Sequence, residues 1–283
     1  MKRLDITVAS AVLFLLLAPS AQAQKLVQAP REDGASTPLR VYAPSDNGCA
    51  PLALISPGAG GNENGYEYIA QGLQSNGWRA IVMGHKESGG SALGSDMRNA
   101  GGLKRGLQEL VNDPKAYDGR LMDIAAALKW AATLCKAPFV TLIGHSMGAR
   151  TVMVEAGAMN NLGVKGRDRF DAYIALSPDG PGEMFPENAW AGIRKPVLML
   201  TGTRDKGLDG EWKSRTIPYD DMPPGCKWLG VINEASHMNF AGVGFAGATK
   251  KLTLLETKAF LDGLLTGKCG SPIQSPGITV TNK

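Results

Sequence analysis

The stretch FVTLIGHSMG, residues 139–148, carries the most informative pattern in this sequence. Residues that favour a β-strand are followed by Gly-x-Ser-x-Gly, and residues 150–154 then continue as a helix-like segment. In a sharp turn from strand to helix, small neighbours let a serine hydroxyl stand above the sheet, and the first N–H groups of the helix favour negative charge beside it. We therefore predict that Ser146 is a nucleophile. The alternative is an ordinary turn serine in a chain that has 36 glycines.

The N-terminus has the features of a secretory signal. Lys2 and Arg3 precede an apolar stretch at residues 8–18, and Ala21-Gln22-Ala23 forms a cleavage site of the A-x-A type. The apolar stretch is well short of the roughly 20 residues that span a bilayer, so residues 1–23 are predicted to be a cleaved signal peptide, with an uncleaved anchor as the alternative. The mature protein is expected in the periplasm or outside the cell, without a stable membrane anchor.

The remaining residues, 24–283, are predicted to form a single domain. They contain no repeat and no second long apolar segment, and the formal net charge of the full chain is only +4. Because there is no run of basic residues, we expect no nucleic-acid partner. The 3 histidines and 4 cysteines lack the spacing of metal ligands, so we expect no metal site.

Short β-branched and aliphatic runs alternate with segments of helical period along the chain. In one such segment, Leu121, Ile124, Ala125 and Leu128 follow the i, i+3, i+4, i+7 spacing of a helix that packs one face on a sheet. The alternation predicts an α/β fold in which a mostly parallel sheet has helices on both faces. The predicted strands are 52–56, 80–83, 139–143, 172–176, 197–201 and 228–232, with a possible edge strand at 39–42, and two further helices are predicted at 66–73 and 252–265.

The glycine-rich segment at residues 84–102 interrupts this alternation, and we interpret it as a loop. Loops at the carboxyl ends of parallel strands form the crevice in which ligands bind. The segment is therefore predicted to border the substrate site, with a mobile surface insertion as the alternative.

A serine hydroxyl needs a neighbouring base, and that base needs an acid that holds its tautomer. The chain has three histidines, His85, His145 and His237. His145 adjoins Ser146 within the turn, where successive side chains point apart, and His85 precedes the serine in the sequence. His237 follows the last predicted strand and completes the order serine, acid, histidine, so we predict that it is the base.

The acid is expected in a loop that follows a strand between Ser146 and His237. Asp205 directly follows such a strand and is the favoured candidate. Asp179, after the preceding strand, is a real competitor, and Asp209 is a weaker one. Loop aspartates are also common as turn formers and helix caps, which is the alternative for each of them.

An acyl-transfer site also needs two N–H donors aimed at the oxyanion of the transition state. The N–H of Met147, the residue after the nucleophile, is predicted to be one of them. The other is expected from the SPGAGGN segment at residues 56–62, whose small residues let the backbone approach a substrate carbonyl. We predict Ala59 as this donor, with Gly60 as the alternative donor and as a substrate-binding residue; a plain glycine turn is the competing interpretation.

With these residues assembled, the chain resembles the α/β-hydrolases, specifically the dienelactone-hydrolase-like branch that includes bacterial proteins similar to platelet-activating-factor acetylhydrolase. The resemblance covers nearly all of residues 24–283. It implies an eight-stranded sheet in the order 1-2-4-3-5-6-7-8, and hydrolysis of carboxylic esters without a cofactor. The motifs that carry it are SPGAGG at 56–61, GHSMG at 144–148, TGTRD at 201–205 and ASHMNF at 235–240.

Departures from the family pattern bear on the substrate. Ser146 stands where a true dienelactone hydrolase has cysteine, so the family name does not define the reaction. Pro57 stands where many relatives have histidine, and polyester hydrolases similar to cutinases share this proline. Those enzymes have an aromatic residue where this chain has Ala59, so polyester cleavage is not favoured.

The predicted mature chain has four cysteines, Cys49, Cys135, Cys226 and Cys269, and export favours disulfides between them. In the strand order that the resemblance implies, the strands preceded by Cys49 and Cys135 are neighbours, so we favour that pair. Cys226, before the last strand, and Cys269, after the last helix, then remain as the second pair. Free thiols are the alternative.

The segment at residues 181–194 is too short to form a large lid domain. Met184, Phe185 and Trp190 within it are predicted to be walls of an acyl pocket, with ordinary surface packing as the alternative. Esters of short or medium acyl chain fit such a site best.

These features together predict an exported serine esterase, a monomer that acts on a small-molecule ester through an acyl-Ser146 intermediate. A serine peptidase or amidase with the same residues is one alternative, although the sequence contains no propeller or large cap that would select peptides. A catalytically inactive hydrolase fold that serves as a binding protein is the other alternative.

Overall fold

The computed structural model describes residues 24–45, 48–207 and 211–283. The predicted signal peptide, residues 1–23, lies outside this part of the chain, and so does Asp209. Within the described residues, nine strands form one sheet. Across the sheet, the strands are β1 (Gln24–Pro30), β2 (Ser36–Tyr42), β4 (Arg79–Met83), β3 (Leu52–Ser56), β5 (Val140–His145), β6 (Ala172–Leu176), β7 (Val197–Arg204), β8 (Lys227–Ser236) and β9 (Ile278–Asn282).

The centre of the sheet is parallel. The strands from β4 to β8 in this order all run in one direction, whereas β2 and β9 are antiparallel to their neighbours in this group and β1 is antiparallel to β2. The prediction of a mostly parallel α/β sheet is therefore confirmed. The order of β1 to β8 is the one that the resemblance implies, and β9 adds a further strand at the edge.

The strands β1 and β9 have no counterpart among the predicted strands. Most of their residues are exposed or only partly buried. Neither a continuous apolar run nor a clear alternation therefore marks them in the sequence. They are defined by their backbone pairing with β2 and β8, which becomes visible only in the folded sheet.

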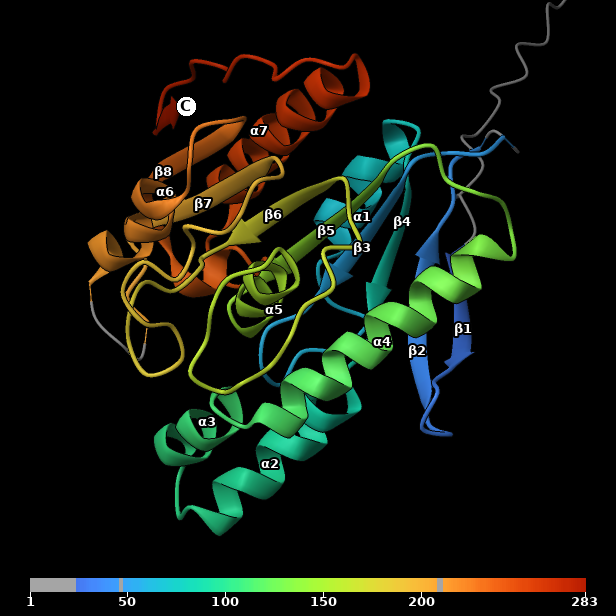
Figure 1. Ribbon diagram of the computed structural model, residues 1–283, viewed down its shortest axis with the longest axis vertical. Helices are drawn as coiled ribbons and strands as arrows, with labels where there is room; N and C mark the ends of the chain where they lie inside the picture. The colour runs from blue at the N-terminus through green and yellow to red at the C-terminus, as the bar shows by residue number, and fades with distance from the viewer. Residues whose placement is uncertain (1–23, 46–47, 208–210) are drawn as a thin grey trace, which may run out of the picture.

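Helices cover both faces of the sheet and create two hydrophobic cores. In Figure 1, α4 (Pro114–Ala132) and α5 (Met147–Glu155) cross the front of the sheet, and α1 (Glu67–Ser75) and α7 (Gly247–Leu265) lie behind it. Alternate residues of β3 point to the two cores, because Leu52 and Leu54 pack in the first and Ala53 and Ile55 in the second. The central strands are buried on both faces, which explains why they are apolar throughout.

The segment at residues 84–102 is largely helical, so its prediction as a loop is wrong. It contains a 3-10 turn (Lys86–Ser88) and α2 (Gly90–Asn99), which α3 (Leu103–Val111) follows; a short α6 (Ile217–Asp221) lies after β7. No residue of α2 is buried, so no apolar stripe marks this helix in the sequence. Gly106 lets α2 and α3 pack closely, because a Cβ there would lie 2.4 Å from the backbone nitrogen of Met97.

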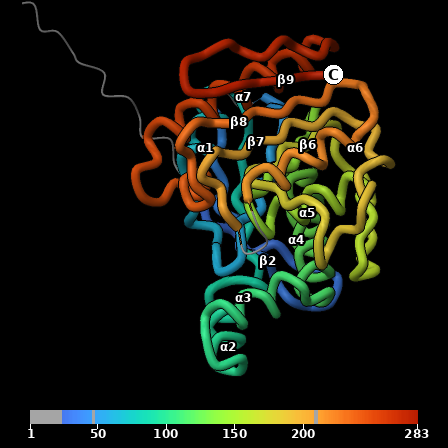
Figure 2. The backbone as a smooth tube through the Cα atoms, turned by 90° about the vertical axis from the view of Figure 1, so that its left-hand side faces the viewer, coloured from blue at the N-terminus to red at the C-terminus, as the bar shows by residue number. Residues whose placement is uncertain are grey.

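In Figure 2, α2 and α3 project from the lower end of the molecule, away from the sheet. They extend the side of the sheet on which the loops after the parallel strands lie. No helix in the described ranges has the length and apolar character needed to cross a membrane.

Two disulfides join the pairs favoured from the sequence, Cys49 with Cys135 and Cys226 with Cys269. Their Cα–Cα distances of 5.8 and 5.3 Å are usual for this bond. The first pair lies just before β3 and β5, which are neighbouring parallel strands. The preference for these pairs over free thiols is therefore confirmed.

Removing either disulfide is expected to lower the free energy of unfolding. The bonds join residues 86 and 43 positions apart, and cross-links over loops of this length are worth about 4 to 5 kcal/mol through the entropy of the unfolded chain. The double variants Cys49→Ser/Cys135→Ser and Cys226→Ser/Cys269→Ser should each unfold at a lower urea concentration than the oxidised wild type. The reduced wild type, which lacks both disulfides, is the control, and its urea midpoint should be lower than that of either variant. An unchanged midpoint in a variant would show that its bond does not stabilise the protein.

Candidate active site

Ser146 lies at the turn between β5 and α5. Its φ of 55° and ψ of −120° are strained for a residue with a Cβ, as expected at a nucleophile turn. Close approach requires the flanking glycines: a Cβ on Gly144 would lie 2.2 Å from the carbonyl oxygen of Gly148, and a Cβ on Gly148 would lie 2.0 Å from that of Ser56. The Gly-x-Ser-x-Gly pattern therefore forms the strand-to-helix turn predicted from it.

The structure brings Ser146, His237 and Asp205 together from the segments that follow β5, β8 and β7. Oγ of Ser146 is 2.9 Å from Nε2 of His237, and Nδ1 of His237 is 2.9 Å from Oδ1 of Asp205. The Asp205 side chain is completely buried, whereas the His237 side chain is partly exposed. In this arrangement an imidazole can take the serine proton while a carboxylate keeps its other nitrogen protonated.

Asp205 is surrounded by donors that keep it ionised. Besides His237, the hydroxyls of Ser177 and Thr201 each donate to it at 2.9 Å, and Nε of Arg215 lies 3.2 Å from Oδ1. Burial alone would raise the pKa of Asp205, but the hydrogen bond from His237 and the charge of Arg215 outweigh it and lower the pKa below its ordinary value. A negatively charged Asp205 can therefore stabilise a protonated His237.

The residues that support Asp205 were missed in the sequence. Ser177 and Arg215 belong to no motif, and Thr201 begins the TGTRD motif, which pointed only to Asp205; Arg215 lies in a 3-10 turn (Trp212–Thr216) between β7 and α6. Ser177 directly follows β6, and Thr201 lies in the second half of β7, three residues before its carboxyl end. Their position near the end of a strand is the only feature of the sequence that points to Ser177 and Thr201. Many other residues share that position, so it does not identify partners of Asp205.

Asp179, the competing acid, lies near this cluster but makes other contacts. Its carboxylate accepts hydrogen bonds from Arg150 and Arg215. Burial tends to raise the pKa of Asp179, but the charges of these two guanidinium groups lower it below its ordinary value. Of the two candidate aspartates in the described part of the chain, only Asp205 is hydrogen-bonded to His237.

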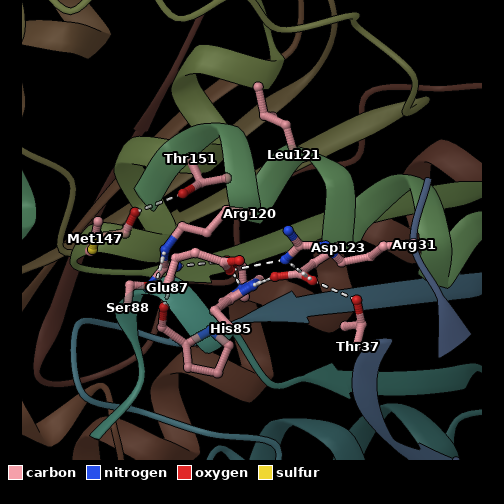
Figure 3. A network of polar contacts seen from close by, with 12 residues as sticks. Arg31, Thr37, His85, Glu87, Ser88, Arg120, Leu121, Asp123, Met147 and Thr151 are labelled. Carbon is pink, nitrogen blue, oxygen red and sulfur yellow. Dashed lines mark hydrogen bonds and ion pairs between the residues drawn. The ribbon is translucent and has the colours of Figure 1, made fainter. Parts of the chain in front are cut away.

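The other two histidines are buried and hydrogen-bonded elsewhere. Nε2 of His145 donates to the carbonyl oxygen of His237 at 3.0 Å, so its Nδ1 accepts from the Tyr66 hydroxyl at 2.7 Å. The same hydroxyl accepts the N–H of Gly58 at 3.0 Å. His145 therefore connects the loop after β3 to the loop that carries His237. His85 is part of a separate buried network, which Figure 3 shows.

The free energy of unfolding is expected to decrease as the pH falls below about 6.5, partly because of His145. Burial, and then the charge of His237, lower the pKa of His145 to about 3. In the unfolded chain the pKa of a histidine is near 6.5. Between about pH 6.5 and about pH 3 the unfolded state therefore binds about one more proton than the folded state, so a falling pH stabilises the unfolded state. From pH 7 to pH 5 this costs the folded protein about 2 kcal/mol.

Urea denaturation at pH 7 and pH 5 tests this expectation. The variant His145→Gln is the comparison, since its amide can donate to the His237 carbonyl and accept from Tyr66 but does not titrate. It should lose less stability between the two pH values than the wild type. Equal losses would contradict a neutral, buried His145.

Two backbone N–H groups beside Ser146 are available to a ligand. Among the described residues, the N–H groups of Met147 and Ala59 have no hydrogen-bond acceptor. The N–H of Gly60 donates to the carbonyl oxygen of Ser88 at 2.8 Å. Gly60 is therefore wrong as the alternative oxyanion donor, although it lines the hollow beside Ser146. Of the two residues proposed in this loop, Ala59 is the one with a free N–H.

Two adjoining hollows meet at Ser146 and share His237, Leu107 and Met238 in their walls. One, of about 280 Å³, contains charged side chains, namely Arg150, Asp179, Lys206 and Arg215. The other, of about 350 Å³, is lined by the glycine-rich loop after β3 and by apolar residues that include Ala241 and Val243. Leu107, which lines both hollows, belongs to α3 and follows the segment at residues 84–102. Among the described residues, that segment itself lines neither hollow, so the prediction that it borders the substrate site is not confirmed; its Ser88 accepts the N–H of Gly60 from behind the loop after β3.

The prediction of Met184, Phe185 and Trp190 as acyl-pocket walls is wrong. Among the described residues, these three line neither of the hollows that contain Ser146. At most 3% of each residue is exposed, and the rings of Phe185 and Trp190 pack 5.2 Å apart in the core. Their apolar side chains pack inward, so α3 and the segment after His237 supply the walls instead.

The sequence matches no protein-family model and no curated protein. The structure is similar to Est1E from Butyrivibrio proteoclasticus, with a TM-score of 0.60 and 16% sequence identity over 85% of this chain and 99% of that chain. It is also similar to the esterase domain of a Rhodothermus marinus protein, with a TM-score of 0.53 and 15% identity over 81% of this chain and 92% of that chain. At these identities the likeness shows the fold alone: the chain has an α/β-hydrolase fold.

Proposed function

We propose that this protein is an exported serine hydrolase that cleaves carboxylic esters of short to medium acyl chain. The observation that carries the proposal is the hydrogen-bonded series Ser146, His237 and Asp205 beside the N–H groups of Met147 and Ala59. Its likeness to Est1E and to an esterase domain supports the same class of reaction. Its place in the dienelactone-hydrolase-like branch is part of the proposal and rests on the sequence motifs.

The first half of the reaction forms an acyl-enzyme. His237 Nε2 takes the proton of Ser146 as Oγ attacks the carbonyl carbon of the ester, and Asp205 stabilises the resulting imidazolium. The negative oxygen of the tetrahedral intermediate accepts hydrogen bonds from Met147 and Ala59, each worth about 3 kcal/mol of barrier. The intermediate then collapses, and His237 gives its proton to the departing alcohol.

The second half releases the acid. His237 takes a proton from water as the water oxygen attacks the acyl carbon, and the same two N–H groups bind the second oxyanion. Collapse of this intermediate breaks the bond to Oγ of Ser146, which recovers its proton from His237. Every step uses side chains and backbone of this chain.

The two hollows suggest how an ester is oriented. The hollow beside the loop after β3 is mostly apolar and suits the acyl chain, and its volume of about 350 Å³ is at the low end of the roughly 300 to 1,000 Å³ of small-molecule sites. This supports short and medium chains. The charged hollow with Arg150, Asp179 and Arg215 suits a polar alcohol.

The proposed location is the periplasm or the medium. Two disulfides support an oxidising compartment, and the signal peptide predicted at residues 1–23 supports export. We propose that the mature protein acts as a monomer on a small-molecule ester, without a nucleic-acid partner and without a stable membrane anchor.

Turnover of p-nitrophenyl esters from acetate to palmitate, with fluorophosphonate labelling, tests the function. A rate that peaks at short or medium chains, and a label on Ser146, are the expected results. Faster turnover of amides than of matching esters would instead favour a peptidase or amidase. A folded protein with neither turnover nor label would favour the inactive binding protein.

A further inference from the structure

The side chain of Arg120 is buried behind the glycine-rich loop after β3. Only 1% of this α4 residue is exposed. One of its terminal nitrogens donates to the carbonyl oxygen of Pro57 at 2.8 Å and to the hydroxyl of Ser56 at 3.1 Å, and the other donates to the carbonyl oxygen of Gly58 at 3.4 Å. Nε donates to the hydroxyl of Ser88 at 2.8 Å. Figure 3 shows the guanidinium group reaching from the helix toward Ser88.

These contacts define the orientation of two successive peptide groups. In a trans peptide, the carbonyl oxygen and the following N–H point in opposite directions. Because Arg120 holds the carbonyl of Pro57, the N–H of Gly58 points to the other side, where it meets the Tyr66 hydroxyl. The carbonyl of Gly58 accepts from Arg120 at 3.4 Å and from the N–H of Gly61 at 3.1 Å, and these two bonds together turn the N–H of Ala59 away from the guanidinium group.

Within residues 24–45, 48–207 and 211–283, no carboxylate is bonded directly to the guanidinium group of Arg120. Its four hydrogen-bond acceptors are uncharged oxygens of Ser56, Pro57, Gly58 and Ser88. The carboxylate of Asp123 is instead bonded to Arg31, Thr37 and His85, as Figure 3 shows. Burial lowers the pKa of Arg120 to about 10, so the group remains protonated at neutral pH. A cation that is bonded to a carbonyl in a low-dielectric interior polarises that peptide and strengthens its N–H as a donor.

We propose that Arg120 is a positioning residue for oxyanion stabilisation: it orients the Gly58–Ala59 peptide and strengthens the Ala59 N–H. This inference rests on the proposed esterase function. Arg120 does not touch the substrate and acts through the backbone that it holds. The competing explanation is that Arg120 only fills and stabilises the interior between α4 and the loop.

The ratio of kcat/KM for an ester to kcat/KM for the matching thionoester distinguishes the two explanations. Sulfur accepts hydrogen bonds more weakly than oxygen, so this ratio reports how well the site stabilises an oxyanion. Arg120→Lys keeps a charge but cannot reach all four acceptors. We expect it to lower kcat for the ester by about 10- to 100-fold with little change in KM, and to lower the ester-to-thionoester ratio by about tenfold.

If the variant only lowers the fraction of folded or active enzyme, the apparent kcat/KM falls by the same factor for the ester and for the thionoester, and the ratio does not change. An unchanged ratio in Arg120→Lys would therefore overturn the proposal. The matched control is Arg169→Lys, because Arg169 pairs with buried Glu155 and contacts α4 only at the carbonyl of Leu121. This control should keep the wild-type ratio.

A milder variant decides the matter if Arg120→Lys does not fold. Ser88→Ala removes the acceptor of Nε and leaves the guanidinium group in place, so it should lower the ratio in the same direction by a smaller factor. An unchanged ratio in this variant would then overturn the proposal. Turnover that survives in Ser146→Ala would instead refute the proposed function itself, so the two failures are distinguishable.

Discussion

Ser146→Ala is expected to lower kcat for ester hydrolysis by about 10⁶-fold, to a residual rate that binding and the oxyanion donors still support. The variant removes the only atom that forms the acyl bond in the proposed mechanism. His237 and Asp205 stay in place but have no hydroxyl to activate. Because alanine fits the turn without a new contact, the free energy of unfolding should change little. Steady-state kinetics with a p-nitrophenyl ester, on protein checked by circular dichroism, measures the effect.

The matched control for this variant is Ser177→Ala. The Ser177 hydroxyl also lies in the cluster, 2.7 Å from Nδ1 of His237 and 2.9 Å from Asp205, but it is on the far side of the imidazole from Ser146. We expect a loss of about tenfold, because one of several hydrogen bonds to Asp205 disappears. Fluorophosphonate should label Ser177→Ala and leave Ser146→Ala unlabelled. The reverse labelling would show that Ser146 is not the nucleophile.

Asp205→Asn is expected to lower kcat by about 10⁴-fold with the fold intact. An amide at this position can donate its N–H to Nδ1 of His237, which favours the wrong tautomer for a base, and it cannot stabilise the imidazolium. The variant also removes the charge beside Arg215, so the free energy of unfolding should fall as well, but the protein that remains folded should still show the loss of kcat. Kinetics over a range of pH, with urea denaturation alongside, separates these two effects.

Asp179→Asn is the matched comparison for the acid. This carboxylate pairs with Arg150 and Arg215 and makes no hydrogen bond to His237 among the described contacts. We expect its main effect on the free energy of unfolding, a loss of about 2 to 4 kcal/mol from weakened buried pairs. A larger loss of kcat in Asp179→Asn than in Asp205→Asn would contradict the assignment of Asp205.

The central fold was predictable because burial on both faces leaves a mark in the sequence. The central strands β3 and β6 are almost entirely apolar, and the other parallel strands contain apolar runs. In α4 the helix itself was predicted, but its buried face differs: of the predicted stripe Leu121, Ile124, Ala125 and Leu128, only Ile124 is buried, and Arg120 and Asp123 are buried with it. The edge strands β1 and β9 and the exposed helix α2 bury little surface, so their sequences have no comparable pattern. Backbone pairing with β2 and β8 stabilises β1 and β9, and close packing on α3 at Gly106 stabilises α2. Neither kind of contact can be recognised from the amino-acid sequence.

The candidate nucleophile and base could be chosen from the chemistry of their local sequence. The turn at Ser146 excludes side chains on both glycines, so a recognisable pattern accompanies it. The acid had no such marker, since Asp179 and Asp205 both follow strands. The fold distinguishes them, because it places Asp205 on Nδ1 of His237 and Asp179 between two arginines.

The sequence by itself determined the alternation of strands and helices, the turn at Ser146 and the candidate base, because each depends on residues that are close together along the chain. Only the tertiary structure decided the walls of the hollows, the partners of Asp205 and the contacts of Arg120. Arg120 reaches Pro57 across 63 residues of sequence, and the predicted pocket residue Trp190 turns into the core instead. Such contacts depend on how separate segments pack, and packing is a property of the whole fold.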